Sequence, residues 1–236
     1  MRRGDKLAGL IAAASPAPIS STDALVVAHK VVSKAEGRTR ALGQVQAGER
    51  ARTLATEHGK DARVVQVILD ESAEILRADG GRFICLTHHG MVCANAGVDA
   101  SNTSGDDEVV LLPLDPDESA RALREALHEH TGARPAVLIS DSFGRAWRLG
   151  QTDVAIGAAG FSPLDDWRGR EDSRGRELHA TVIAVADAAT AAADLARTKD
   201  GGQPVVLVRG LERWITEHHG PGAAALRRPL AEDLFR

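Results

Sequence analysis

The amino-acid sequence predicts an α+β protein, a domain of mixed α and β structure whose elements alternate without a regular repeat. Short apolar runs rich in β-branched residues alternate with alanine-rich helical patterns. The strand-like runs are too unevenly spaced for a continuous series of β-α-β units. No Ser/Pro-rich linker, internal repeat or shift in composition divides the chain, so we expect a single domain with mixed sheets over residues 1–236.

Strands are expected where several β-branched or large aliphatic residues follow one another. Six segments meet this description: 24–32, 82–86, 109–112, 136–139, 181–185 and 205–208. Helices are expected between them, where apolar residues recur with helical spacing. These helices cover residues 61–77, 116–130 and 186–197.

The N-terminal residues allow two interpretations. The apolar run 7–14 after two arginines resembles a secretory signal, but Asp5 lies in the basic region and Gly9 interrupts the apolar run. We favour a short helix with Asp5 as its N-cap and Leu7, Leu10 and Ile11 on one face.

Composition excludes several classes of function. A net charge of -4 and a pI near 6.1 disfavour a protein that binds nucleic acid through phosphate contacts. Aromatic residues make up 3% of the chain and tyrosine is absent, so few side chains could stack on nucleic-acid bases. No apolar run is long enough to span a membrane. We therefore expect a cytoplasmic protein that acts on small molecules.

Cysteine and histidine residues cluster in the segment 85–93. Such ligands could suggest zinc, but closely spaced ligands on one strand cannot readily surround an ion tetrahedrally, so buried thiols at Cys85 and Cys93 are favoured. The sequence contains neither the P-loop pattern nor the G-x-G-x-x-G pattern of dinucleotide-binding folds.

Acidic and hydroxyl residues follow two apolar segments. Asp99 lies in a loop of small residues, and the predicted strand 136–139 leads into Ser140, Asp141 and Ser142. Carboxylate and hydroxyl oxygens are ligands suited to magnesium or manganese, provided that the two aspartates meet in space. The alternative is that each aspartate caps a turn.

Basic residues could bind anionic groups. His29, Lys30 and Lys34 lie near the end of the first predicted strand, and arginines that include Arg145, Arg148 and Arg168 crowd a glycine-rich region. Arginine forks in loops suit carboxylates and phosphates, so we infer that these three arginines bind the substrate. The alternative is an ordinary solvated surface.

Several long motifs carry a resemblance to a known family. They are VVAHKVVSKAEGR (26–38), HGMVCANAGVDASN (89–102), ISDSFGRAWRLGQTDVAIG (139–157), GREL (175–178) with AVADAATAAADL (184–195), and PVVLVRGL (204–211). In order, and over nearly the whole chain, they resemble the coenzyme F420-0:L-glutamate ligase (gamma-glutamyl ligase) family, in particular the N-terminal ligase domain of bifunctional actinobacterial enzymes.

The resemblance implies a GTP-dependent amide ligase. GTP would phosphorylate a carboxylate of the deazaflavin precursor, and the amine of L-glutamate would displace phosphate from the acyl phosphate, leaving GDP and a γ-linked glutamate tail that grows by repetition. The family's cofactors are Mg²⁺ or Mn²⁺ together with K⁺. The resemblance also implies an intertwined homodimer.

Site residues follow from motif position. The resemblance implies that Asp99, Asp141 and Ser142 bind the metal and that Lys34 supplies fixed positive charge for catalysis. His29, Lys34 and Asn102 match nucleotide contacts, and we place Lys30 with them. A further nucleotide-contacting segment consists of Arg197, Thr198, Lys199, Asp200, Gly201, Gly202, Gln203 and Pro204.

The chain also departs from the family pattern. Family members usually begin upstream, with a strand and a Leu-Pro turn that contacts the nucleotide, whereas this sequence starts at the following R-P-G-D-like segment, as Arg2, Arg3, Gly4 and Asp5. Residues 227–236 resemble the point where two-domain members continue into a flavin domain, so the chain is expected to be a stand-alone ligase domain or a fragment. The alternatives are a ligase for another amino acid or acceptor, and a non-catalytic deazaflavin-binding partner.

Overall fold

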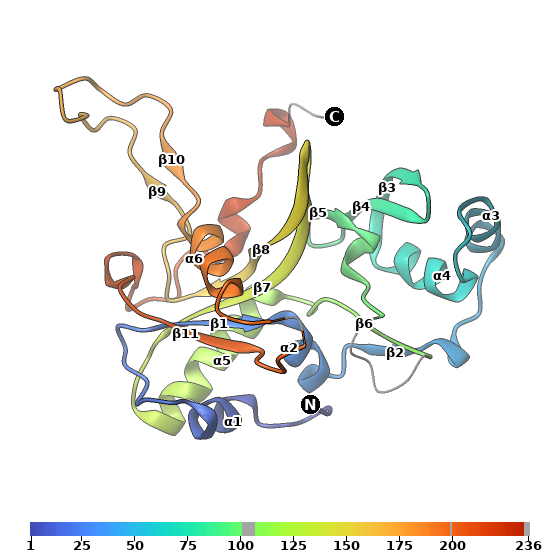
Figure 1. The fold of residues 1–236 in the computed structure, drawn as a ribbon, viewed down its shortest axis with the longest axis horizontal. Helices are drawn as coiled ribbons and strands as arrows, with labels where there is room; N and C mark the ends of the chain where they lie inside the picture. The colour runs from blue at the N-terminus through green and yellow to red at the C-terminus, as the bar shows by residue number, and fades with distance from the viewer. Residues whose placement is uncertain (101–106, 199, 234–236) are drawn as a thin grey trace. The chain divides into compact units, whose positions relative to one another are not determined.

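The computed structural model describes residues 1–100, 107–198 and 200–233. These residues form α-helices, 3-10 helices and several separate β-sheets, so the expected α+β class is confirmed (Figure 1). Contacts within the chain divide it into two compact units. The first unit comprises residues 1–5, 29–115 and 143–151, and the second comprises residues 6–28, 116–142 and 152–236. The expectation of one ligase domain over residues 1–236 stays a prediction.

The second unit is built on a sheet with the strand order β11-β1-β7-β8. The bounds of these strands are Val205–Val208, Ala24–Ala28, Ala136–Arg145 and Arg148–Ala159. β1 is antiparallel to β11 and parallel to β7, with Ala28 opposite Ser140. β1 therefore ends beside the middle of β7, which continues to Arg145. A turn at Ala146 and Trp147 joins β7 to β8, and the tip of this hairpin belongs to the first unit.

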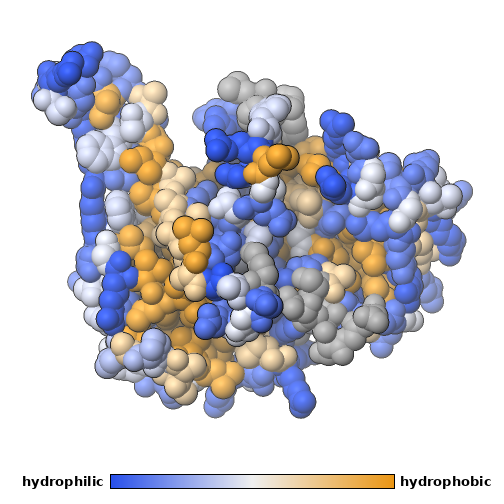
Figure 2. Space-filling model, viewed as in Figure 1, coloured by the Kyte–Doolittle hydropathy of each residue, from blue (hydrophilic) through white to orange (hydrophobic). Residues whose placement is uncertain are grey.

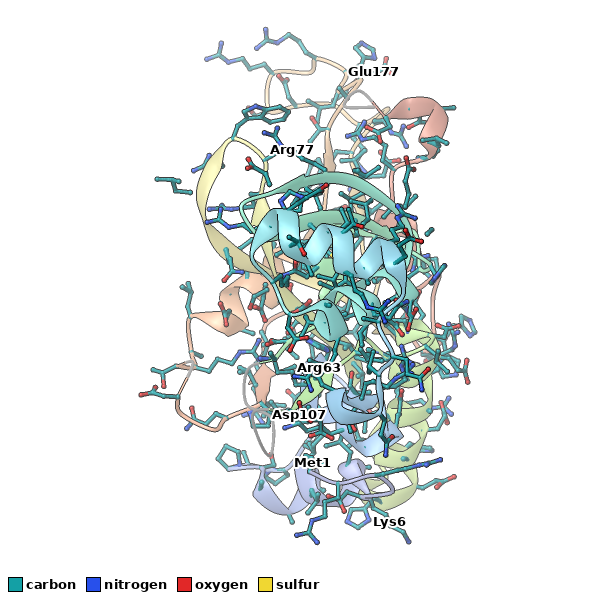
Figure 3. The ribbon with its side chains drawn as sticks, turned by 90° about the vertical axis from the view of Figure 1, so that its right-hand side faces the viewer. Met1, Lys6, Arg63, Arg77, Asp107 and Glu177 are labelled. Carbon is teal, nitrogen blue, oxygen red and sulfur yellow. The ribbon has the colours of Figure 1, made fainter. Side chains whose placement is uncertain are left out.

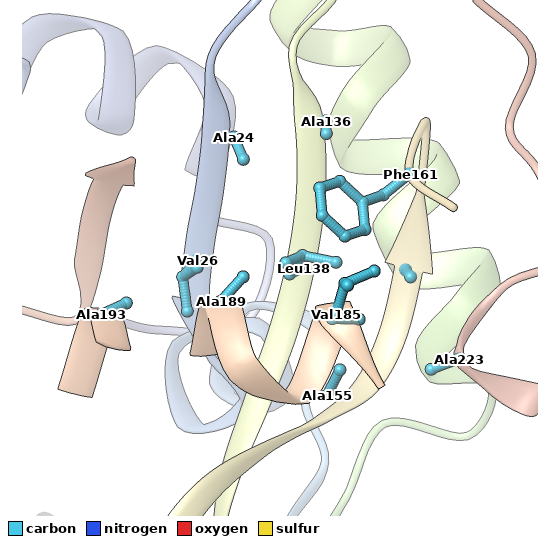
Figure 4. Packing of buried hydrophobic residues seen from close by; sticks show 12 residues of the cluster. Ala24, Val26, Ala136, Leu138, Ala155, Phe161, Val185, Ala189, Ala193 and Ala223 are labelled. Atoms are coloured by element: carbon cyan, nitrogen blue, oxygen red, sulfur yellow. The ribbon is translucent and has the colours of Figure 1, made fainter. Parts of the chain in front are cut away.

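Helix α6 (Val185–Asp194) packs on one face of this sheet (Figure 4). Val185 and the alanines on its inner side form a core with alternate residues of β1 and β7, among them Val26 and Leu138, and with Phe161. These alanines are Ala186, Ala189 and Ala193. Side chains alternate along a strand, so Leu25 and Val27 point to the opposite face. Helix α5 (Pro116–Thr131) lies on that face and packs against α1 (Leu7–Ala14) (Figure 1).

Two buried charged side chains of α5 hold distant loops to this unit. Asp117 accepts backbone N–H bonds from Ala158, Ala223 and Ala224 at 2.7 to 3.1 Å. Arg124, which is 1% exposed, donates to the carbonyl oxygens of residues 134, 135, 216, 217 and 218. The C-terminal segment of the unit is therefore fixed by backbone contacts to two side chains of one helix.

A long arm extends from the second unit between β8 and α6 (Figure 1). Its paired strands are β9 (Asp165–Asp166) and β10 (Val182–Ile183), and Glu177 lies near its far end (Figure 3). The end of the arm is hydrophilic, whereas apolar side chains gather toward its base (Figure 2). Among the latter, Leu164, Val182 and Ile183 are 36–44% exposed.

The first unit contains an antiparallel sheet with the order β3-β4-β5. The bounds of these strands are Ser72–Asp79, Arg82–Thr87 and Val92–Ala94. Helices α3 (Glu49–His58) and α4 (Ala62–Asp70) pack together and share a core with the sheet. Phe83 and Cys85 of β4 are fully buried in this core.

A second, two-stranded sheet in the first unit pairs β2 (Thr39–Ala41) with β6 (Glu108–Val110). It follows helix α2 (His29–Glu36) in the chain and contributes Val109 to a small core with Leu42 and Val67. Near one end of β6, Arg63 binds Asp107 at 2.8 Å on the surface (Figure 3).

Several predicted elements are confirmed. β4 and β11 lie where strands are expected, and α5 covers the predicted helix 116–130. β7 begins at Ala136 as predicted but continues to Arg145, because β8 supplies a pairing partner that the sequence analysis missed. β6 ends at Val110, two residues before the predicted strand end.

Other predicted boundaries are wrong. The strand expected over residues 24–32 ends at Ala28, where pairing with β7 ends, and the chain turns directly into α2. The helix expected over residues 61–77 ends at Asp70, because residues 72–79 pair with β4 as β3. Only Val182–Ile183 of the predicted strand 181–185 is a strand, since Val185 starts α6, which itself ends at Asp194.

The N-terminal helix forms, but not with the expected cap or face. Lys6 is the N-cap residue and makes no side-chain cap bond, while the Asp5 carboxylate accepts the Arg2 N–H at 2.7 Å. Ala8 and Ile11 are buried, whereas Leu10 is half exposed. Among the described residues, no helix has both the length and the apolar character needed to cross a membrane.

Candidate functional site

The middle of β7 carries the acid and hydroxyl residues predicted to bind a metal. Ser140 lies opposite Ala28 at the carboxyl end of β1, and Asp141 and Ser142 follow it. An oxygen of the Asp141 carboxylate accepts the backbone N–H of the next residue, Ser142, at 2.8 Å, and both residues lie within β7 rather than in a turn. Both side chains are partly exposed, so their oxygens can reach a ligand.

Asp153 of β8 lies against these residues, and the sequence analysis did not select it. Its side chain is 3% exposed. The Ser142 hydroxyl donates to its Oδ1 at 2.6 Å, and the Ser140 hydroxyl donates to its Oδ2 at 2.7 Å. An acid directly before the apolar run 154–159 is the signal in the sequence that could have identified it, since a charge in a buried strand needs partners.

Arg197 supplies the compensating charge. Its guanidinium forms a close ion pair with Asp153, donates to the Ser140 hydroxyl at 3.1 Å, and lies 3.3 Å from Asp194. The Arg197 side chain is 9% exposed, so it is turned into the fold. Its predicted contact with a nucleotide stays a prediction.

The other described residues of the predicted nucleotide segment, 198 and 200–204, precede β11. The Gly201 N–H donates to the Thr198 carbonyl at 3.2 Å, and Gly202 has a φ of 63°, a backbone conformation that favours glycine. The Pro204 carbonyl accepts the Ala28 N–H at 2.8 Å, which ties the segment to the end of β1. Asp200 and Gln203 are exposed, and Lys199 lies outside the described residues.

In the first unit, Asp99 is held by α2 and β6. Its backbone forms a bridge with Val110, and its carboxylate binds the Lys30 ammonium at 2.6 Å. The two side chains are 26% and 31% exposed. A cation thus already lies against the carboxylate that is predicted to bind a metal.

Helix α2 places the other predicted basic residues of this unit. Lys34 lies one turn after Lys30, so both lysines occur on the same side of the helix. His29 is buried, and its Nδ1 lies 3.4 Å from the Ser33 hydroxyl. Asn102, the remaining predicted nucleotide contact, lies outside the described residues.

The loop before Asp99 is constrained at consecutive positions. Asn95 and Ala96 both have a φ of 53°, and Gly97 has a φ of 71°. The Lys60 ammonium donates to Asn95 Oδ1 at 3.2 Å and to the Gly81 carbonyl at 2.8 Å. Burial lowers the pKa of Lys60, although the neighbouring Cys85 opposes this shift. Lys60, which the sequence analysis did not select, therefore anchors this loop.

The three arginines predicted to bind the substrate lie in different surroundings. Arg145 and Arg148 lie in the β7–β8 hairpin, and Arg145 donates to the Leu149 carbonyl at 2.9 Å. Arg168 belongs to the arm and binds the Asp166 carboxylate at 2.5 Å. A substrate anion at Arg168 would compete with Asp166, and the substrate role of all three stays a prediction.

The donor set fits a hard divalent cation. Asp99, Asp141 and Ser142 offer carboxylate and hydroxyl oxygens, and none offers sulfur or imidazole nitrogen. Because Asp99 belongs to the first unit and the other two to the second, their meeting at one cation stays a prediction. The described residues contain no group of three or more His, Cys, Asp or Glu arranged for a metal.

Cys85 and Cys93 are free and buried, as expected. They lie on neighbouring strands as register partners rather than on one strand, because the chain turns between them at residues 88–91. Burial raises the pKa of the Cys85 thiol. These cysteines belong to the core of the first unit.

Comparison with known proteins agrees with the motifs. A family described as F420-0:gamma-glutamyl ligase matches residues 1–210. A coenzyme F420:L-glutamate ligase of Methanopyrus kandleri is 45% identical, over 100% of this chain and 93% of the relative. Proteins with the same name from Methanothermobacter thermautotrophicus and Archaeoglobus fulgidus are 41% and 45% identical, covering 99% and 89% of this chain and 93% and 84% of their own lengths.

Proposed function

The chain belongs to the F420-0:gamma-glutamyl ligase family and is a ligase, and from this premise we propose that it joins L-glutamate to the deazaflavin precursor F420-0. The observation that carries the proposal is the match over residues 1–210, which includes every motif position assigned to catalysis and metal binding. Successive additions would build a γ-linked tail.

We propose GTP as the source of energy. In the first step, an oxygen of the acceptor carboxylate attacks the γ-phosphorus of GTP, the bond from that phosphorus to the β–γ bridging oxygen breaks, and GDP leaves. In the second step, the glutamate amine attacks the acyl carbon, the carbon–oxygen bond to phosphate breaks, and phosphate leaves. The amine proton passes to a base.

The residues of α2 support the first step. A carboxylate and a triphosphate repel each other, so fixed positive charge must offset their approach. Lys34 would supply this charge, one turn after Lys30, whose ammonium pairs with the Asp99 carboxylate. His29, Asn102 and the segment 197–204 complete the proposed nucleotide contacts.

Asp99, Asp141 and Ser142 would hold Mg²⁺ or Mn²⁺. When bound, such a cation neutralises charge on the phosphate oxygens during transfer. Potassium is proposed as a second cofactor. Arg145, Arg148 and Arg168 would bind the phosphodiester and carboxylates of the acceptor.

We further propose that the protein is an intertwined homodimer. The arm 163–183 extends from its own unit, and apolar residues near its base are exposed (Figure 2). A second copy would cover Val182 and Ile183, which water otherwise contacts. This surface supports the proposal.

The activity can be tested by GDP release. We expect release only when GTP, a divalent cation, L-glutamate and the deazaflavin precursor are all present. Asp141→Asn should lower the rate by about 100-fold or more, at least as much as the loss of an outer partner of a metal site. Asp79→Asn, at an exposed carboxylate of β3, is the matched control and should keep the wild-type rate. Equal rates for the two variants would contradict the role of Asp141.

A further inference from the structure

Asp153 connects the strand expected to hold the metal with the segment expected to contact the nucleotide. Its Oδ1 accepts a hydrogen bond from Ser142, and its Oδ2 accepts from Ser140 and binds Arg197. These residues all belong to the second unit. The side chains of Asp153 and Arg197 are 3% and 9% exposed, so the ion pair is shielded from water.

The direction of the Ser142 hydrogen bond follows from chemistry. An ionised carboxylate has no proton, so Asp153 can only accept, and the hydroxyl of Ser142 must donate. A serine hydroxyl has one proton and two lone pairs. With its proton committed to Asp153 at 2.6 Å, the Ser142 oxygen directs its lone pairs away from the carboxylate.

Ser140 has a different role in the same network. Its hydroxyl donates to Asp153 at 2.7 Å and accepts from Arg197 at 3.1 Å, and the residue is 1% exposed. Residues two apart on a strand lie on the same side, so both serines of β7 face Asp153 of β8. Ser140 therefore holds the ion pair, whereas the partly exposed Ser142 extends from it.

We propose that Asp153 is a positioning residue that fixes Ser142 with its oxygen lone pairs toward the divalent cation, and that the ion pair with Arg197 holds the Asp153 carboxylate in place for this task. The inference rests on the proposed function, since it takes Ser142 as a metal ligand. It also explains why Arg197 is buried. Its ion pair with Asp153 and its hydrogen bond to Ser140 join the segment after α6 to β7 and β8.

The test measures Mn²⁺ binding by the full-length protein, using the electron paramagnetic resonance signal of free Mn²⁺ with GTP present. Asp153→Asn should weaken Mn²⁺ binding by about tenfold or more, as loss of an outer partner of a metal ligand does. Asp79→Asn, at an exposed carboxylate of β3 outside this network, is the control, and its Mn²⁺ affinity should equal that of wild type.

A double-mutant comparison separates positioning from general destabilisation. If Asp153 acts through Ser142, Asp153→Asn should cause no further loss of Mn²⁺ affinity in a Ser142→Ala protein. An additional tenfold loss there would overturn the inference. Equal Mn²⁺ affinities of Asp153→Asn and Asp79→Asn would also overturn it, provided that Asp141→Asn has lost binding. Unchanged binding by Asp141→Asn would instead contradict the proposed metal site.

A structure of the wild-type protein crystallised with Mn²⁺ tests the same point if Asp153→Asn does not fold. We expect the Ser142 hydroxyl to keep its hydrogen bond to Asp153 Oδ1 while its oxygen contacts the cation. A Ser142 side chain that contacts Mn²⁺ after turning away from Asp153 would overturn the inference.

Discussion

Individual buried charged side chains hold loops of this protein in place by bonding to their backbone, and Arg124 is the clearest example. The sequence predicts the helix that contains it, over residues 116–130. In the sequence alone, nothing distinguishes Arg124 from the other charged residues of that helix. Its burial depends on carbonyl groups from residues 134–135 and 216–218, which only the folded chain brings together.

Arg124→Met should lower the free energy of unfolding by about 3 kcal/mol or more, since each buried acceptor left unpaired costs roughly 1–3 kcal/mol. Urea unfolding followed by circular dichroism measures this change. Arg121→Met, on an exposed part of the same helix, is the control and should change stability by less than about 1 kcal/mol. Similar losses for both variants would contradict the role assigned to Arg124.

Asp166 illustrates a charge pair on the surface. Hydrogen bonds from Arg168 lower the pKa of Asp166 to about 2. Because this pKa is lower in the folded state, the pair stabilises the fold above the ordinary aspartate pKa, and that contribution is lost as pH falls toward 2. Carbon-detected NMR titration should give a midpoint near 2 for Asp166, and Arg168→Ala should raise it toward the ordinary aspartate value, because the backbone N–H of residue 168 keeps its bond to Asp166. An unchanged midpoint in the variant would contradict this pairing.

At the scale of elements, pairing between distant strands outweighs local pattern. The helical spacing of Val64, Ile68, Ile75 and Leu76 favours one helix, yet Ser72–Asp79 pairs with β4. Backbone bonds to a neighbouring strand are not visible in a local pattern. In contrast, α5 and β11 have strong local signals and were predictable.

The loop before Asp99 depends on Gly97. A Cβ at Gly97 would lie 2.6 Å from Leu112 Cγ, and the residue has a φ of 71°. Gly132 has a φ of 76° with nothing within 4 Å, so it is a matched control for the backbone strain alone. Gly132→Ala should cost about 1–2 kcal/mol, and Gly97→Ala about 1–3 kcal/mol more because of overpacking. Thermal unfolding of both variants checks the difference, and equal losses would exclude the steric effect.

At the scale of the whole molecule, the order of motifs along the chain indicated the function better than any single helix or strand did. Asp141, Ser142 and Lys34 are identified by motif, whereas the supporting roles of Asp153 and Lys60 follow from their neighbours in the fold. The division into two units was not predicted, because no linker or change in composition marks it. The sequence therefore predicts the chemistry of the proposed site better than the side chains that support it.

The proposed homodimer makes a prediction at this scale. Sedimentation should detect a dimer, and Ile183→Asp should shift the protein toward monomer, because it places a charge on the apolar base of the arm. Leu195→Asp is the control, since Leu195 is 90% exposed but lies after α6. A wild-type protein that sediments as a monomer would contradict the dimer.

Mass spectrometry of the reaction product tests the central claim most directly. The protein is incubated with F420-0, GTP, Mn²⁺ and an equimolar mixture of amino acids that includes L-glutamate. If the protein ligates L-glutamate to F420-0, we expect products heavier than F420-0 by whole glutamate residues, with one GDP formed for each residue added. A product carrying a different amino acid, or unchanged F420-0 in the presence of bound GTP, would contradict it.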